Sequence, residues 1–167
     1  MALLPILQLP DPRLRERGAR VETFDEKLHA LIADMFETMY AAPGIGLAAT
    51  QVGVSLQLAV MDCSEAHNEQ RVLINPEVLA EDDLEEMEEG CLSIPDVQEK
   101  VRRYNHITVR AQDAAGQSYE IKAEGLLAQC LQHEIDHLNG KLFVDYLSRL
   151  KRDRIKKKMV KLHKREQ

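Results

Sequence analysis

The chain has 167 residues, of which 44% are hydrophobic, so it is long enough for one domain with a sizeable core. No internal repeat and no apolar run of about 18 residues is present, which excludes a transmembrane helix, and only three cysteines argue against a disulfide framework and indicate a reducing compartment. The net charge of −6 is unevenly distributed, because residues 149–167 hold ten Lys or Arg and two acids (+8) and the other residues carry −14.

The first quarter of the chain predicts one short and one long helix. Two prolines interrupt the apolar first ten residues and no Lys or Arg precedes them, so we expect an edge strand there and no secretory signal. Asp11 followed by Pro12 is typical of a helix start and predicts a short helix or turn to about Glu16. An apolar period of 3.6 residues predicts a longer helix over 25–41, with one apolar face formed by Leu28, Leu31, Ile32, Met35, Phe36 and Met39.

The middle of the chain predicts short strands. Segments 56–61 and 71–79 are rich in strand-forming residues, and the second contains Asn75 before a proline, which indicates a turn or bulge. Segments 106–112 and 118–122 alternate in polarity and flank a short turn, which is typical of a β-hairpin. These strands are not separated by a regular series of helices, which favours an antiparallel arrangement.

The acidic run 81–89, with seven acids in nine positions, is expected to be a solvated loop because like charges repel.

Helices dominate the C-terminal part. A helix is predicted over 125–138, ended by Asn and Gly, and a basic helix starts at about Ser148. We therefore expect an α+β fold in which antiparallel strands pack around the 125–138 helix, with a catalytic part over 1–147 and a basic C-terminal helix of the same domain over 148–167.

Residues 133–137 read His-Glu-Ile-Asp-His, an H-E-x-x-H motif inside the predicted 125–138 helix. Residues four apart lie one turn apart on the same helix face, so His133 and His137 can bind one metal ion. Glu134 is then placed to accept a proton from a metal-bound water. The alternative is two ordinary histidines with a helix-favouring Glu between them.

A catalytic metal site needs a third protein ligand and an open position. The long metallopeptidase signature would put a third His at Phe143, which cannot bind a metal, and the only Glu after His137 is Glu166 at the chain end. The sequence therefore lacks the third ligand of both common peptidase types. The remaining candidates for the third metal ligand in this chain are Cys63, Cys91 and Cys130. Cys130 could equally be a residue that packs beside the site.

Two other segments carry unusual patterns. Residues 44–53 read G-I-G-L-A-A-T-Q-V-G, which alone would fit a tight structural turn, and residues 89–95 read E-G-C-L-S-I-P. With Q-H-E-I-D-H at 132–137, these motifs resemble the peptide deformylase family in type, order and approximate spacing. The resemblance extends over nearly the whole chain, including residues 142–146 and the basic terminal helix, which looks like the branch typical of many Gram-negative bacteria.

The resemblance implies a metal-dependent hydrolase that removes the formyl group from the N-terminal formyl-methionine of newly made polypeptides and releases formate. Cys91, His133 and His137 would hold one divalent metal ion. Iron(II) is expected in the cell, with zinc, nickel or cobalt as substitutes, although the donor set by itself suggests zinc.

The resemblance also implies how the reaction is catalysed. A metal-bound water would attack the formyl carbon, with Glu134 as general base and then general acid. The side-chain amide of Gln51 and the backbone N–H of Leu92 would stabilise the oxyanion, which agrees with the need for preorganised donors in formamide hydrolysis. Glu89 and Asp136 would hold the geometry of the site. Residues expected to contact or line the substrate site are Gly44, Ile45, Gly46, Glu89, Gln129 and Cys130.

The chain departs from the family pattern at two positions. Gln129 stands where many members have an apolar residue lining the methionine pocket, and Gln98 stands where an Arg is often found near the substrate backbone. Neither change removes a catalytic group. Both leave the fine substrate preference open.

The basic C-terminal helix predicts a polyanionic partner. The resemblance implies that this partner is the ribosome, through RNA or protein near the exit tunnel, so we expect a cytoplasmic enzyme with no membrane attachment. A monomer is expected because no large apolar face lacks a use. The alternative functions are a peptidase and a non-catalytic ribosome-bound module.

Overall fold

The fold is built on one antiparallel sheet. The computed structural model describes the backbone of residues 3–166 and the side chains of residues 3–164. The five strands of the sheet follow chain order across it. They are β1 (Gly46–Ala48), β2 (Leu58–Met61), β3 (Arg71–Cys91), β4 (Ile94–Gln112) and β5 (Ser118–Glu124).

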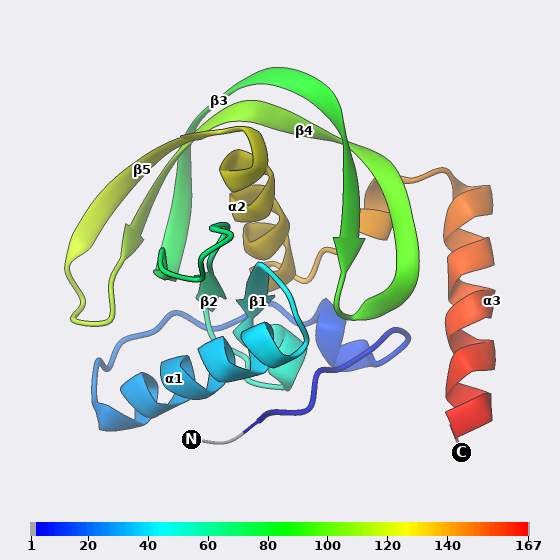
Figure 1. The fold of residues 1–167 in the computed structure, drawn as a ribbon, viewed down its shortest axis with the longest axis horizontal. Coiled ribbons are helices and arrows are strands. Elements are labelled where there is room, and N and C mark those ends of the chain that lie inside the picture. The colour runs from blue at the N-terminus through cyan, green and yellow to red at the C-terminus, as the bar shows by residue number, and fades with distance from the viewer. Residues whose placement is uncertain (1–2, 167) are drawn as a thin grey trace.

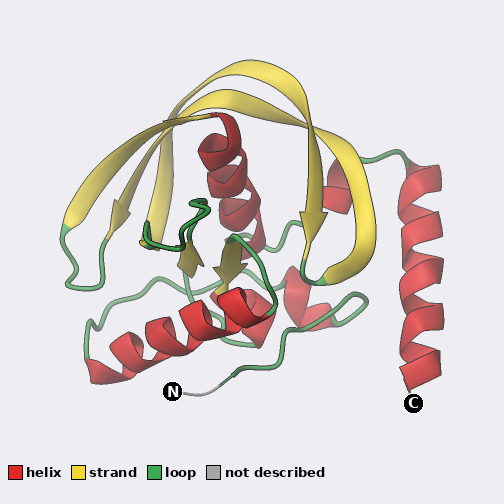
Figure 2. Cartoon of the chain, viewed as in Figure 1, coloured by secondary structure: helices red, strands yellow, loops and turns green. Residues whose placement is uncertain are grey.

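The two longest strands, β3 and β4, arch together over the central helix α2 (Gly125–Leu138) (Figure 1). Their pairing shifts register between Ile74 and Glu77 and again between Val78 and Ala80, and such bulges bend a strand. The curved strands therefore enclose α2 instead of lying flat against it (Figure 2). The buried side chains of α2 include apolar and polar groups: Ala128, Cys130, Leu131, His133, Glu134, His137 and Leu138.

Two further helices pack outside this arch. Helix α1 (Glu26–Ala41) begins at Asp25, whose carboxylate accepts the Leu28 N–H at 3.1 Å, and its apolar face packs beneath β1 and β2 (Figure 1). Helix α3 (Arg149–Glu166) stands at the other side of the molecule, attached through buried Ile155 and Met159. Single 3₁₀ turns connect these elements: η1 (Pro12–Arg15), η2 (Ala49–Val52) and η3 (Phe143–Tyr146).

The structure confirms the α+β class and all three long helices that the sequence predicts. Helix α2 has the predicted bounds and ends at Asn139, and the hairpin of β4 and β5 is also confirmed. None of the helices in the described part of the chain combines the length and hydropathy that crossing a bilayer requires.

The predicted N-terminal strand is wrong. Residues 3–8 form no strand, and Met1 and Ala2 lie outside the described residues. The segment is instead extended and fastened by single backbone hydrogen bonds from Leu7 N–H to Gln51 O (2.7 Å) and from Leu9 N–H to Ser93 O (2.9 Å).

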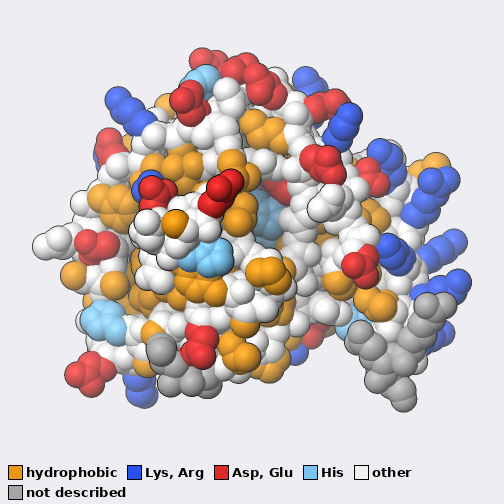
Figure 3. Space-filling view, in the orientation of Figure 1, with side chains coloured by type: hydrophobic (Ala, Val, Ile, Leu, Met, Phe, Trp, Pro, Cys, Tyr) orange, Lys and Arg blue, Asp and Glu red, His pale blue; other side chains and the backbone are white. Residues whose placement is uncertain are grey.

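The predicted acidic loop is also wrong, because residues 81–89 belong to β3. The cross-strand neighbours on β4 explain how a strand tolerates this charge: Glu85 is paired with Arg103, Glu86 with Arg102 and Glu88 with Lys100. Opposite charges on facing positions stabilise a ladder. Acidic side chains gather along the arch of β3 and β4 at the top of Figure 3, and Lys and Arg gather on α3 at its right.

We expect Gly140→Ala to destabilise the fold more than Gly125→Ala. Both glycines have positive φ, +78° and +63°, which costs an L-residue about 1–2 kcal/mol. A Cβ at residue 140 would also lie 2.3 Å from Arg15 O, whereas nothing lies within 4 Å of one at residue 125. Overpacking of this kind adds about 1–3 kcal/mol. Urea unfolding at matched metal content measures both variants, and equal losses would show that the contact with Arg15 is unimportant.

Candidate active site

Three potential metal ligands converge on one point in the described structure. The ligand atoms of Cys91, His133 and His137 all lie within 4.8 Å of one another. The Nε2 atom of His137 lies 3.3 Å from Cys91 Sγ and 3.0 Å from His133 Nε2. Of the three cysteines that the sequence leaves as candidates, the structure brings Cys91 to the histidines, and neither Cys63 nor Cys130 joins the cluster.

This donor set fits a metal ion. Thiolate and imidazole ligands suit transition metals better than magnesium or calcium. Three protein ligands leave the fourth position of a tetrahedral ion for water or substrate, which is typical of catalytic sites. The site is therefore a Cys-His-His metal centre.

The turn after β3 brings Cys91 to the helix. Cys91 is the last residue of β3, and Leu92 and Ser93 form the turn into β4. Gln51 is 1% exposed, and its Oε1 atom accepts the Ala48 N–H at 2.9 Å. The amide nitrogen of Gln51 therefore points the other way, 3.1 Å from Ser93 Oγ and 3.6 Å from Cys91 Sγ.

Burial and neighbouring side chains together set the protonation of the groups on α2. Burial raises the pKa of Glu134 to about 7, against a smaller lowering by His133. Its Oε1 atom is buried with no hydrogen-bond partner among the described residues. Burial lowers the pKa of His137, which favours the neutral form that binds metals. For His133 the effect of burial is outweighed by Cys91 and Glu89, which raise its pKa.

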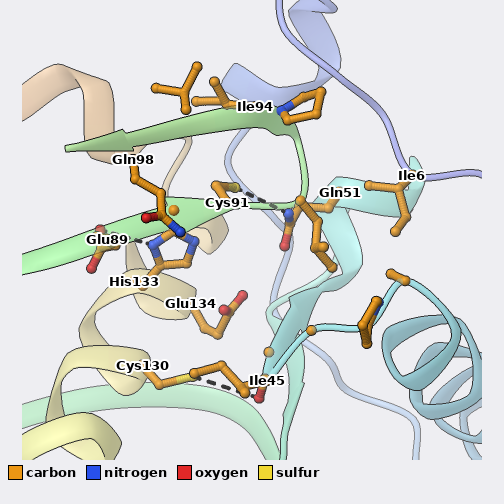
Figure 4. Close-up of a pocket in the computed structure, with 18 of the residues that line it drawn as sticks. Ile6, Ile45, Gln51, Glu89, Cys91, Ile94, Gln98, Cys130, His133 and Glu134 are labelled. Carbon is orange, nitrogen blue, oxygen red and sulfur yellow. Dashed lines mark hydrogen bonds and ion pairs between the residues drawn. The ribbon is translucent and has the colours of Figure 1, made fainter.

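A buried ionic network supports His133 from behind. Glu89 Oε2 lies 3.0 Å from His133 Nδ1 (Figure 4). The same oxygen lies 2.6 Å from an Arg103 nitrogen. Arg103 also contacts Asp136 at 2.7 Å, and Asp136 accepts the hydroxyl hydrogen of Tyr146 at 2.8 Å. For Glu89, burial raises the pKa, but the hydrogen bonds to His133 and Arg103 outweigh it and lower the pKa to about 2.

A cavity of about 1000 Å³ opens over this site. Figure 3 shows histidine surface at the base of a hollow in this face, and in Figure 4 Glu134 points into the cavity from α2. His137 is 1% exposed and reaches the site through its Nε2 atom. Apart from His137 and Asp136, the residues predicted for the site line the cavity: Gly44, Ile45, Gly46, Gln51, Glu89, Cys91, Leu92, Gln98, Gln129, Cys130, His133 and Glu134.

One wall of the cavity ends in a free sheet edge. Strand β1 is the first strand of the sheet, and among the described residues it pairs only with β2. Its first residue, Gly46, lines the cavity together with Ile45. Such an edge offers main-chain groups to an extended peptide.

Sequence reasoning missed Arg103, Ser93 and Tyr146 as parts of the site. A signal for Arg103 was present, because it shares the odd-numbered, inward-facing register of Val101 and Ile107 on β4. An Arg at an inward position requires a buried partner. Ser93 and Tyr146 act through contacts that local pattern does not reveal.

Comparison with known proteins agrees with this site. The family model described as polypeptide deformylase matches residues 3–153. The chain is 61% identical over 165 residues to a peptide deformylase from Azotobacter vinelandii, with 98% of each chain covered. It is 57% identical to a peptide deformylase from Pseudomonas aeruginosa, with 99% of each covered.

Solved structures agree as well. A peptide deformylase from Legionella pneumophila has a TM-score of 0.95 at 53% identity, covering 99% of this chain and 98% of that one. The Ehrlichia chaffeensis enzyme in complex with actinonin has a TM-score of 0.93 at 42% identity, covering 96% and 98%. These matches span nearly the full length of both chains, and the metal centre lies within the matched residues. The chain therefore belongs to the peptide deformylase family.

Proposed function

We propose that this protein removes the formyl group from the N-terminal formyl-methionine of newly synthesised polypeptides and releases formate. One observation carries the proposal: a Cys-His-His donor set lies at the base of a cavity of about 1000 Å³ together with Glu134, whose Oε1 atom has no hydrogen-bond partner among the described residues. A metal site, a proton acceptor and room for a peptide are the components of metal-assisted amide hydrolysis.

Cys91, His133 and His137 would hold one divalent cation. When bound, this cation would supply Lewis-acid chemistry, which acidifies water and polarises a carbonyl oxygen. We infer iron(II) as the physiological metal from the family resemblance, with zinc, nickel and cobalt as substitutes. Metal analysis of protein purified without oxygen, coupled to a formate-release assay, tests this identity.

Glu134 would move the proton. Its burial and its raised pKa of about 7 suit a group that accepts a proton near neutral pH and later returns it. The carboxylate would take a proton from the attacking water and deliver it to the nitrogen of the leaving methionine. Its Oε1 atom has no hydrogen-bond partner among the described residues, so no protein donor holds that oxygen away from this exchange.

Gln51 and the backbone N–H of Leu92 would stabilise the oxyanion. The hydrogen bond from Ala48 N–H to Gln51 Oε1 fixes the amide so that its N–H₂ group points toward the Cys91 side of the cavity. A donor held in place before the reaction stabilises developing negative charge without reorganisation.

The substrate would bind as an extended strand along Ile45 and Gly46, beside the free edge of β1. Its methionine side chain would lie in the cavity near Gly44, Gln129 and Cys130. The Gln129 amide donates to Glu88 O at 2.7 Å. This hydrogen bond gives the Gln129 amide nitrogen a backbone partner, so that nitrogen need not compete with an apolar side chain in the pocket.

Glu89 and Arg103 would position His133. A carboxylate on Nδ1 of a ligand histidine fixes the ring and leaves Nε2 for the metal. The ion pair with Arg103, 3% exposed, keeps Glu89 in the charged form that this role requires. Asp136 forms a second ion pair with Arg103, and the Tyr146 hydroxyl donates a hydrogen bond to Asp136.

Helix α3 would dock the enzyme on the ribosome in the cytoplasm, as a basic segment of the same domain as residues 1–147. Its Lys side chains lie exposed on the outside, whereas Ile155 and Met159 attach it to the body. Phosphates of RNA attract such a surface. We propose a monomer, and two of the exposed large apolar side chains, Ile45 and Leu126, already have a use at the substrate cavity.

Cys91→Ala is expected to lose most of the bound metal and nearly all deformylase activity, because it removes a direct ligand. Cys63→Ala is the matched control and should keep both. Metal content by elemental analysis and formate release measure the two effects. Full metal occupancy in Cys91→Ala would contradict the assignment.

Glu134→Gln is expected to keep the metal and to lower kcat by about a hundredfold or more, the usual size of a lost general base. The amide has the size of the carboxylate but cannot accept the proton. Steady-state kinetics on a formyl-Met peptide, with metal content measured in parallel, test this. Loss of metal with little change in rate per bound ion would instead make Glu134 structural.

Replacing Lys157, Lys161 and Lys164 by Gln should weaken ribosome binding and leave hydrolysis of a short formyl-Met peptide unchanged, because these side chains are exposed and far along α3. This change keeps Ile155 and Met159, which a truncation would remove from the core. Sedimentation with ribosomes over a salt series measures binding, which should fall as salt rises.

The matched control replaces three exposed lysines elsewhere by Gln, at Lys27, Lys122 and Lys141. It makes the same change in net charge and should bind ribosomes almost as the unmodified protein does. If both triple variants lose binding equally at matched salt, α3 has no specific docking role.

A further inference from the structure

Two cysteines that the metal centre does not use belong to one packed cluster: Cys130, which lines the substrate cavity, and Cys63, which lies behind it. Cys63 follows β2, and Cys130 is on α2. The Ile45 carbonyl oxygen is approached from both sides, by the N–H of Asp62 at 2.8 Å and by Cys130 Sγ at 3.8 Å. Cys63, next to Asp62, packs against the core cluster that contains Cys130, and each of the two thiols shifts the pKa of the other. Both thiols are free.

We propose that Cys63 and Cys130 form a reversible disulfide when the protein meets a peroxide, and that this disulfide lowers deformylase activity. The two thiols pack in one cluster beside the Ile45 carbonyl, so side-chain rotation and a local shift can bring the sulfur atoms to bonding geometry. Disulfides that form in a reducing compartment are usually transient and redox-sensing. The pair is thus a modification site separate from the Cys91 metal ligand.

The two thiols differ in exposure and in pKa, as oxidation by a peroxide followed by disulfide formation requires. Cys63 is partly exposed, and the interaction with Cys130, together with the nearby charge of Arg71, lowers its pKa despite partial burial. Cys130 is 4% exposed, and its contact with Cys63 and its burial raise its pKa. The accessible, more acidic thiol is the one that a peroxide oxidises first.

The reaction balances in two steps. The Cys63 thiolate attacks one oxygen of the peroxide, which becomes a sulfenic acid on sulfur while the other oxygen leaves as hydroxide and is protonated to water. Cys130 then attacks the Cys63 sulfur, the S–S bond forms and a second water leaves. Two thiols are oxidised by two electrons and one peroxide is reduced. Attack by an added dithiol reverses the change.

The position of Cys130 connects this disulfide to the substrate site. A Cβ atom added to Gly46 would lie 3.0 Å from Cys130 Sγ and 2.4 Å from Glu134 Oε2, so the backbone at residue 46 is in close contact with both. In Figure 4 Cys130 approaches the Ile45 carbonyl from α2. Drawing Cys130 Sγ toward Cys63 would change its contacts with Ile45 and Gly46, the proposed peptide-binding segment.

The test uses the full chain loaded with nickel, so that oxidation of iron does not contribute. Treatment with hydrogen peroxide should lower the intact mass by about 2 Da, the two hydrogens lost on disulfide formation. Peptide mapping without reductant should join the Cys63 and Cys130 peptides. Because a displacement of about 1 Å at a site can cost up to a hundredfold, we expect kcat/KM to fall by about tenfold or more. Dithiothreitol should restore it.

The control is Cys63→Ala, which removes a residue outside the catalytic and binding groups. It should start with unchanged activity and retain it through the same peroxide treatment, because Cys130 then has no partner. The proposal is overturned if the unmodified protein loses activity while Cys63 and Cys130 stay reduced. It is also overturned if Cys63→Ala is inactivated equally, or if the disulfide forms and leaves kcat/KM unchanged.

Discussion

The rest of the site depends on the ion pairs that the buried guanidinium of Arg103 makes. Removing one partner of such a pair costs about 3–5 kcal/mol, because the other charge stays buried alone. Arg103 on β4 contacts Glu89 on β3 and Asp136 on α2, and its guanidinium carbon lies 4.8 Å from the Tyr146 ring centre. The pKa of Glu89, lowered from 4.5 to about 2, means that its charge stabilises the fold above about pH 4.5. That contribution is lost as the pH falls toward 2.

The same network links folding to metal chemistry. Glu89 lies within 3.0 Å of both Arg103 and His133, so the arch and the metal centre share one carboxylate. The metal ligands come from two elements, with two histidines on α2 and Cys91 at the end of β3. The ionic network therefore holds together the two elements whose separation determines whether the ligand atoms meet.

Local pattern predicted the parts of this structure that depend on neighbours in sequence. The bounds of α2 and the shared face of His133 and His137 follow from helical periodicity and a Gly stop signal. Pairing between distant segments was less visible. The acidic run 81–89 was interpreted without its cross-strand partners, because Arg102 and Lys100 lie on another strand. Arg103 was missed for the same reason, since its partners are 14 and 33 residues away.

The short length of β1 has a consequence for what the enzyme can distinguish. An edge strand reads a guest chain through its amide and carbonyl groups, so it senses direction and extended shape but not the identity of side chains. Three residues span about 10 Å at roughly 3.3 Å each. Recognition along this edge would end within the first few residues of a guest. Polypeptides with unrelated sequences beyond their start would then be equivalent, which suits an enzyme that serves a whole proteome.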